Sequence, residues 1–140
     1  MYQKLLILFI LPVITACTGS EPVPFKLGKD GCDHCKMTIM SNKHGLELIT
    51  DKGKIYKFDD LSCGITYSKL HTTSGDKLYA VDYNTGAFLE ANTAFYVKSD
   101  KNKTPMNSMI LAFKSKTEAE KLQKSKGGVM LTWESVQDLY

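Results

Sequence analysis

Soft donor atoms are concentrated between positions 30 and 40, where two cysteines, two methionines and one histidine occur together. Cys32 and Cys35 have the spacing Cys-x-x-Cys, and Cys35 and Met37 have the spacing Cys-x-Met. Thiolate and thioether sulfurs together favour Cu(I) over harder ions. Lys36 lies next to Cys35, where its charge favours the thiolate form that binds metals. The segment therefore predicts a Cu(I) site with Cys32, Cys35 and Met37 as candidate ligands.

The Cys-x-x-Cys pair by itself has other uses, which include zinc binding, dithiol redox chemistry and haem attachment. Haem attachment requires His directly after the second Cys, and Lys36 occupies that position. A structural zinc needs four ligands. Cys63 and a histidine could supply the two ligands that Cys32 and Cys35 leave missing. A redox dithiol is expected between a buried strand and a helix, whereas residues 29–31 are not typical of a strand. A structural zinc lipoprotein and a periplasmic dithiol oxidoreductase remain as alternatives.

A second methionine-bearing segment, Thr104-Pro105-Met106, lies far downstream. Met106 follows a proline in a predicted loop, where a core role is less expected, so it is a candidate distant ligand. Met109 begins an apolar run, and we assign it, together with Met130, to packing.

The remaining nitrogen and sulfur donors are less clearly assigned by the sequence. His34, His44 and His71 are plausible imidazole ligands, and nothing in the sequence ranks His34 against His44. Cys63 falls in the first turn of a predicted helix, where the helix dipole lowers a thiol pKa. It is equally consistent with a small buried residue, and Met40 is equally consistent with the core.

The elements that must position these residues can be read from hydrophobic periodicity and turn residues. Residues 44–50 and 54–58 form a predicted hairpin around the turn at 51–53. A helix capped by Asp59 or Asp60 follows, and then a strand over residues 78–83.

The second half shows the same order of elements. Strands are predicted over residues 95–97 and 109–113, followed by a helix from Ser115 to Lys126 and a strand over 129–131. Ser115 and Glu118 have the spacing of a capping box, and Thr132 can cap a last short helix. The pattern predicts an α+β fold of two related ββαβ units, about 44–83 and 87–131, within one compact domain over 25–140.

The N-terminus has the layout of an export signal, with Lys4 ahead of a short apolar run over residues 5–14. That run is shorter than the ~20 apolar residues that span a bilayer. Ile14-Thr15-Ala16-Cys17 resembles the bacterial lipobox, in which the cysteine carries the lipid. We therefore expect a signal peptide over 1–16, lipidation at Cys17, and a tether over 17–24 that holds the domain to the extracytoplasmic face of a membrane.

The charged residues bear on the class of partner, and the number of cysteines bears on the use of the thiols. All 18 basic residues are lysine, against 15 acidic residues, and without arginine a nucleic-acid partner is a poor fit. If Cys17 is lipidated, three cysteines remain, and an odd number in an exported protein cannot all be paired. Metal binding gives the thiols a use.

Several motifs occur in order along the chain and together resemble one known family. They are Cys32-x-x-Cys35-x-Met37, Phe58-Asp59-Asp60 with Cys63, Tyr79-x-Val81-Asp82, Ala94-x-Tyr96-Val97, Thr104-Pro105-Met106, Ala112-Phe113, and Gly127-Gly128 with Trp133. This set is similar to the NosL family of nitrous oxide reductase accessory lipoproteins. The resemblance covers nearly all of the chain after the signal peptide.

The resemblance implies a Cu(I) chaperone rather than an enzyme. Its expected recipient is nitrous oxide reductase or another exported cuproenzyme, and its expected partner is a dedicated ABC-type transporter. The resemblance also implies the fold of two ββαβ units, with Cys35, Met37 and Met106 as ligands. Many relatives have glycine where Lys36 and Asn107 stand in this chain.

The lipobox leads to a first test. In Cys17→Ala we expect incorporation of labelled fatty acid to be lost and an unprocessed or soluble form to accumulate, because the acceptor thiol is gone. Labelling in the expressing cell followed by gel analysis measures this, with wild-type protein as the control. Fatty-acid labelling that persists in the variant would contradict the lipoprotein assignment.

Overall fold

The computed structural model describes residues 21–140. The predicted signal peptide and the lipidation site at Cys17 lie outside the described residues and stay predictions. Within residues 21–140, no helix combines the length and the apolar character that a membrane crossing requires.

The first sheet is antiparallel throughout and has the strand order β2-β1-β3-β4. Its strands are β1 (Leu46–Ile49), β2 (Ile55–Phe58), β3 (Lys77–Val81) and β4 (Phe88–Glu90). Helix α1 (Leu61–His71) connects β2 to β3 and packs against β1 and β2. The hairpin, helix and strand expected in this half are confirmed. The short strand β4 was not expected, because three residues are too few to show a period.

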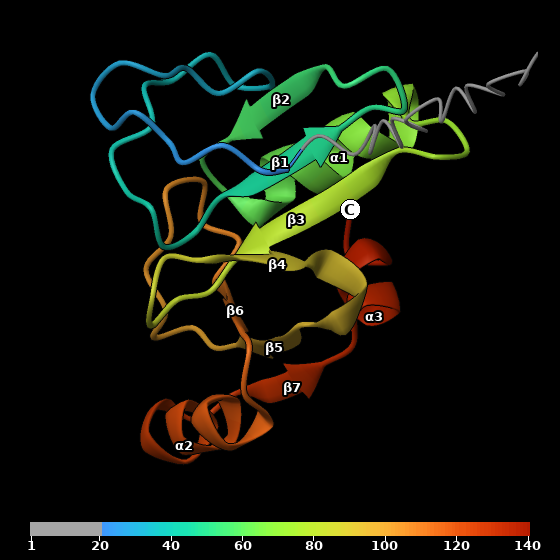
Figure 1. Ribbon diagram of the computed structural model, residues 1–140. Helices are drawn as coiled ribbons and strands as arrows, with labels where there is room; N and C mark the ends of the chain where they lie inside the picture. Colours follow the sequence, from blue (N-terminus) through green and yellow to red (C-terminus); the bar gives the residue numbers. More distant parts are fainter. Residues whose placement is uncertain (1–20) are drawn as a thin grey trace, which may run out of the picture.

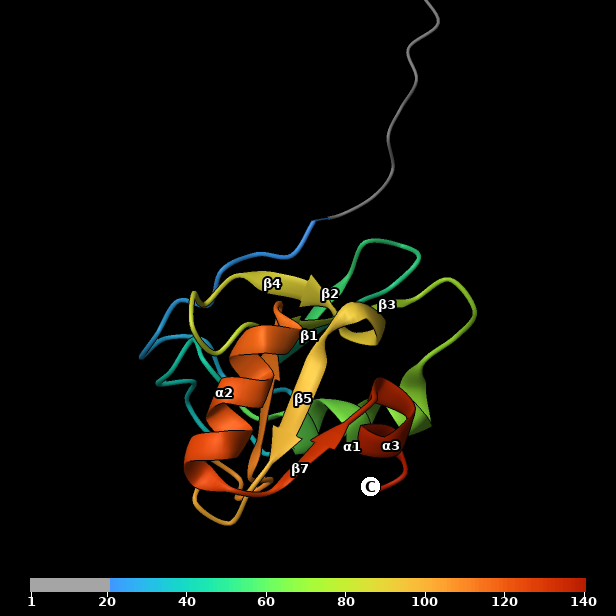
Figure 2. The ribbon, with the colours of Figure 1, turned by 90° about the horizontal axis from the view of Figure 1, so that it is seen from below.

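The second sheet is also antiparallel and has the order β6-β5-β7. Its strands are β5 (Phe95–Lys98), β6 (Ile110–Phe113) and β7 (Val129–Leu131), with helix α2 (Lys116–Lys126) between β6 and β7. A short 3-10 helix, η1 (Ala91–Thr93), leads from β4 into β5, and α3 (Trp133–Gln137) follows β7. Figures 1 and 2 show α2 and α1 well apart, each beside its own sheet.

The two halves share one plan, which confirms the α+β fold of two ββαβ units. In both, the first strand is central, the second strand is its hairpin partner, and the strand after the helix pairs on the other side. Both helices have 11 residues and begin three positions after a phenylalanine, Phe58 or Phe113. The predicted repeat is therefore a repeat of topology.

The two helices begin in different ways. Asp60 caps α1, and its carboxylate accepts a hydrogen bond from the Ser62 N–H at 2.9 Å. Ser115 stands at the N-cap of α2, but its side chain makes no capping bond. The Glu118 carboxylate instead accepts a hydrogen bond from the Asn84 amide at 3.3 Å. The predicted capping box is therefore wrong, because a contact with the β3–β4 connection takes its carboxylate.

A single large apolar cluster joins the two units. It contains buried side chains from β1, β2, α1, β3, β5, β6 and α3, including Leu46, Phe58, Ile65, Tyr96 and Ile110. Residues just after β3 also join the second sheet. The Tyr83 N–H donates to the Ala112 carbonyl at 2.8 Å, and the Asp82 carboxylate accepts from the Lys114 N–H at 2.9 Å.

The chain before β1 covers part of the first sheet as an irregular segment, drawn in blue to teal beside β1 and β2 (Figure 1). Its first described part is tied to β1, where the buried Glu47 carboxylate accepts a hydrogen bond from the Val23 N–H at 3.0 Å. This segment carries the predicted metal-binding residues, and its path along the sheet determines where they lie.

Close packing of α1 on the sheet generates a stability test. A Cβ at Gly64 would lie 2.7 Å from Leu46 Cδ2 and 3.0 Å from Phe58 Cδ2. In Gly64→Ala this overpacking, of order 1–3 kcal/mol, exceeds the helix-propensity gain of ~1 kcal/mol. We expect a net loss of up to about 2 kcal/mol in the free energy of unfolding, measured by denaturant titration.

The matched control is Gly31→Ala, because a Cβ there meets no atom within 4 Å. Its unfolding free energy should change by no more than ~0.5 kcal/mol. A Gly64→Ala protein as stable as the wild type would contradict the tight contact between helix and sheet.

Candidate metal centre

A tight backbone loop brings Cys32 and Cys35 together. The loop closes through a β-bridge between Gly31 and Thr38. Within it, the Cys32 N–H donates to the Met37 carbonyl at 2.8 Å, and the Lys36 N–H donates to the Cys32 carbonyl at 3.0 Å. Lys36 has a left-handed backbone with φ of 65°, which turns the chain back toward the sheet. Local backbone bonding therefore sets the spacing of the two thiols.

Polar contacts with β2 hold this loop beside the sheet. The Asp33 N–H donates to the Lys57 carbonyl at 2.8 Å, and the Asp33 carboxylate accepts from the Lys57 N–H at 2.7 Å. The Lys57 ammonium forms an ion pair with the Asp30 carboxylate at 2.6 Å. Since β2 leads into α1, the loop lies next to the first turn of that helix.

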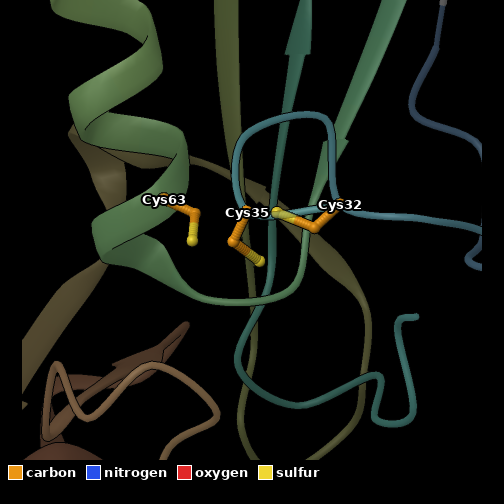
Figure 3. Close-up of side chains that lie close together, drawn as sticks. All are labelled: Cys32, Cys35 and Cys63. Atoms are coloured by element: carbon orange, nitrogen blue, oxygen red, sulfur yellow. The ribbon is translucent and has the colours of Figure 1, made fainter. Parts of the chain in front are cut away.

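Cys63 projects from the first turn of α1 toward this loop and completes a cluster of three thiols (Figure 3). The sulfur atoms of Cys32, Cys35 and Cys63 all lie within 4.8 Å of one another. Cys32 and Cys63 are buried, with 1% and 3% exposure, and Cys35 is partly exposed. All three are free thiols. Three converging sulfurs on two segments can coordinate one soft cation.

The environment of the cluster favours a thiolate at Cys32. Hydrogen bonding with Cys63 and with the backbone at Asp59, Cys35 and His34 lowers the pKa of Cys32, against the opposing effect of burial. The pKa of Cys63 is raised because its proton is held by Cys32 and because it is buried. Burial also raises the pKa of Cys35. Of the three thiols, Cys32 is therefore the one that ionises most readily.

Asp59, which precedes the N-cap residue of α1, is also buried. One oxygen of the Asp59 carboxyl has no hydrogen-bond partner among the described residues. Burial, together with the nearby Cys32 and Asp60, raises the pKa of Asp59 to about 6. This carboxyl therefore titrates at a higher pH than an exposed aspartate does.

Asp60 connects the Thr104-Pro105-Met106 loop to the same region. One carboxylate oxygen of Asp60 caps α1, and the other accepts a hydrogen bond from the Met106 N–H at 2.9 Å. Met106 then lines a shallow surface depression that reaches Cys63, which we call the Met106 depression. Its lining residues are His34, Ser62, Cys63, Thr66, Met106, Asn107, Ser108 and Tyr140.

The predicted ligands thus differ in how the structure places them. Cys32 and Cys35 are brought together, and Met106 is brought to the depression at Cys63. Met37 lies within the loop and is 50% exposed, and Met106 is 41% exposed. Both methionines are therefore at the surface, and their roles as ligands stay predictions.

The histidines lie in three different settings. His34 is exposed and lines the Met106 depression. His44 is half-buried against Tyr83, and burial lowers its pKa. His71 stacks on Tyr67 at the last turn of α1, the end opposite Cys63. Among residues 21–140, no histidine or carboxylate joins the three cysteines in a group of mutually close donors.

The other methionines divide between core and surface. Met130 packs against the cluster of Val97, Leu111 and Phe113, as expected. Met109 does not begin the strand; it has φ of 60°, is half-buried and belongs to neither apolar cluster, so its assignment to packing is wrong. Its backbone bonds to the Thr104 hydroxyl instead and shapes the loop. Met40 is 72% exposed and is not part of the core.

Cys63 is the member of the cluster that the sequence left undecided between a reactive and a packing role. Two signals pointed to it: its place in the first turn of a capped helix, and the odd number of cysteines left after Cys17. Only the packing of α1 beside the cysteine loop turns these signals into a third converging thiol.

Fold and site together define a compact α+β protein with a three-thiol cluster suited to a soft metal ion. The chain belongs to the NosL family, whose family model matches residues 22–140. Among solved structures, the copper chaperone NosL from Shewanella denitrificans is similar, with a TM-score of 0.66 and 19% sequence identity. That match covers 81% of this chain and 96% of the other, and it shows a shared fold. Comparison with curated proteins gave no match.

Two residues of the site loops adopt a backbone conformation that favours glycine. They are Lys36 and Asn107, where the resemblance implied glycine in many relatives, and their φ angles are 65° and 59°. Glycine adopts this conformation without steric cost. Here a lysine adopts it while its ammonium donates to the Asp33 carbonyl at 2.6 Å, and asparagine is among the residues that tolerate it.

The thiol network leads to a spectroscopic test. In Cys63→Ala the S–H donor to Cys32 is lost, so the pKa of Cys32 should rise and its thiolate should appear only at higher pH. Ultraviolet absorbance of the apo protein during a pH titration under reducing conditions measures this. Cys63→Ser, which keeps an O–H donor, is the matched control and should shift the titration less. Identical titration curves for wild type and Cys63→Ala would contradict the hydrogen bond.

Proposed function

We propose that this protein is a Cu(I) chaperone that delivers copper to an exported cuproenzyme. The observation that carries the proposal is the convergence of three thiols, from Cys32, Cys35 and Cys63, in a member of the NosL family. The structurally similar protein from Shewanella denitrificans is described as a copper chaperone. The sequence motifs and the fold therefore support the same function.

The donor set favours Cu(I) over zinc. Thiolate and thioether ligands select Cu(I). Two exposed methionines could add thioether sulfur: Met37, two positions after Cys35, and Met106, in the depression that reaches Cys63. Structural zinc sites are closed by four protein ligands. Among residues 21–140 no fourth nitrogen or oxygen ligand converges with the cysteines. A site of three sulfurs suits a low-coordinate monovalent ion.

The position of the site suits transfer rather than catalysis. A depression at the surface reaches Cys63, so an acceptor can approach one side of the cluster while the protein holds the other. Ligand exchange moves the ion without any change in oxidation state. The dithiol alternative has less support, because Cys32 and Cys35 lie in a loop rather than at the start of a helix.

We infer the copper recipient, the partner and the membrane anchor from the NosL family and from the lipobox at Cys17. Nitrous oxide reductase is the proposed recipient, and an ABC-type maturation transporter is the proposed partner. Lipidation of Cys17 would anchor the protein to a membrane on its periplasmic or extracytoplasmic side. Each buried methylene of an acyl chain contributes ~0.8 kcal/mol to such anchoring.

Metal titration of anaerobically purified protein tests the proposal. We expect one Cu(I) per chain, retained in competition with a colorimetric Cu(I) chelator, and no tight site for Zn(II) or Cu(II). Cys35→Ser should lose this binding, because it removes one of the three converging sulfurs. Met130→Leu, which changes a methionine in the second unit's core, should bind as the wild type does.

The alternatives give different results in the same experiment. Stoichiometric zinc that survives dialysis, with no uptake of Cu(I), would support a structural zinc protein. Disulfide reductase activity lost equally in Cys32→Ser and Cys35→Ser would support an oxidoreductase.

A further inference from the structure

Charge is distributed unevenly along this fold. Residues 94–132, which contain β5, β6, α2 and β7, include eight lysines and three acidic residues. The other described residues, 21–93 and 133–140, include nine lysines and twelve acidic residues. The second unit is therefore strongly positive, whereas the remainder of the described chain has a small excess of negative charge.

Two segments of the second unit bring their lysines to one end of the domain. The Ser99 hydroxyl, at the start of the loop after β5, donates to the Lys126 carbonyl at the end of α2 at 3.1 Å. The Asn102 N–H donates back to the Ser99 carbonyl at 2.9 Å, so the loop turns beside the end of the helix. We call the lysines of these two segments the basic end: Lys98, Lys101, Lys103, Lys121, Lys124 and Lys126.

The lysines of the basic end are not neutralised by the protein's own carboxylates. Among residues 21–140, none of the six lies within ion-pair distance of an acidic side chain. Four of them are exposed, and Lys98 and Lys126 are half-buried. Lysines in the last turn of a helix complement its dipole, which accounts for Lys124 and Lys126. It does not account for Lys121 or for the lysines of the loop, and unpaired charges of one sign repel one another.

The exposed side of α2 is hollowed as well as charged. A shallow depression of about 480 Å³ runs along it, lined by Thr117, Glu120, Lys121, Lys124 and Ser125. These residues recur at helical spacing and so lie on one side of the helix. Glu120 is paired with Lys116 at 3.7 Å, whereas the two lysines of the depression and the Thr117 hydroxyl can donate hydrogen bonds to carboxylates. Acidic side chains of another molecule can therefore lie in this depression.

The place of the basic end favours a protein partner over a membrane. The described chain enters the domain at the first sheet, where the Val23 N–H is held by Glu47 of β1. Helix α2 packs on β5, β6 and β7, and Figure 1 shows it at the opposite end of the molecule from β2. A lipid on Cys17 would therefore hold the first sheet next to the bilayer and leave α2 facing away from it. A nucleic acid is a poor fit, because the chain has no arginine.

We propose that the basic end is a docking surface for an acidic region of a protein partner. Opposite charges steer two proteins together and raise their rate of association. None of the three thiols belongs to this surface, so partner docking goes beyond the proposed function. Docking can therefore be changed without changing the metal site.

A short fluorescein-labelled polyglutamate peptide is the probe for this surface. Fluorescence anisotropy with the full-length protein in detergent should show binding that weakens as salt is added, because salt screens exposed charges. The triple variant Lys101→Gln, Lys121→Gln and Lys124→Gln should bind the peptide at least about tenfold more weakly, since three exposed charge contacts together contribute that factor.

The matched control removes the same charge from the first unit, through Lys52→Gln, Lys69→Gln and Lys77→Gln. These three lysines are exposed, and Lys69 lies in the last turn of α1 as Lys124 does in α2. The control variant should bind the peptide within about twofold of the wild type. Circular dichroism melts and Cu(I) titrations should be unchanged in both variants.

Lysine acetylation, located by mass spectrometry, separates a protein partner from a lipid surface. On the wild-type protein the peptide should protect Lys101, Lys121 and Lys124 and leave Lys52 as reactive as before. Full-length protein anchored in phosphatidylcholine vesicles should show the same reactivity at these lysines when the vesicles also contain phosphatidylglycerol.

Three results would overturn the docking surface. The wild type could fail to bind the peptide, the two triple variants could weaken binding equally, or phosphatidylglycerol rather than the peptide could protect the basic end. The last result would assign the basic end to the membrane. A protein that binds the peptide as expected but takes up no Cu(I) would overturn the proposed function alone.

Discussion

The carboxylate of Asp60 is the contact on which the arrangement of the site depends. It is fully buried, and its two oxygens accept hydrogen bonds from the first turn of α1 and from the Met106 loop, which lies 46 positions after Asp60. A buried carboxylate is costly unless its oxygens accept hydrogen bonds, so both segments must stay in place for the fold to remain stable. The position of Cys63 and that of Met106 are therefore determined together, although the sequence places them far apart.

Elements with strong local signals could be predicted from the sequence, because their causes are local. The α1 cap at Asp59 or Asp60, of which Asp60 is the cap, the helix end at Gly127 and the alternation in β1 and β2 each depend on a few neighbouring residues. Cys32 and Cys35 were identified for the same reason, since one loop contains both. Cys63 remained undecided because its role depends on how α1 packs against that loop. Met109 was misassigned because an apolar residue before a strand gives no sign of its positive φ.

Duplication of the ββαβ plan explains how a small chain supports a site built from distant segments. Each unit has its own hairpin and helix, but most large buried side chains belong to one cluster that both units share. The segment before β1 contributes Cys32 and Cys35, the first unit contributes Cys63, and the second unit contributes the loop with Met106. The connection after β3, where Asp82 and Tyr83 bond to the second sheet, fixes the relative position of the two contributions.

If Cys17 is acylated as proposed, the bond between the Val23 N–H and the Glu47 carboxylate limits how far the domain can stand from the membrane. Because Val23 is held on β1, only about six residues separate an acylated Cys17 from the folded domain. A fully extended chain reaches at most ~3.6 Å per residue, so the linker can be at most roughly 20 Å long. The three-thiol cluster would then stay within a thin layer next to the bilayer. It would mainly meet proteins that are embedded in, or bound to, the same membrane.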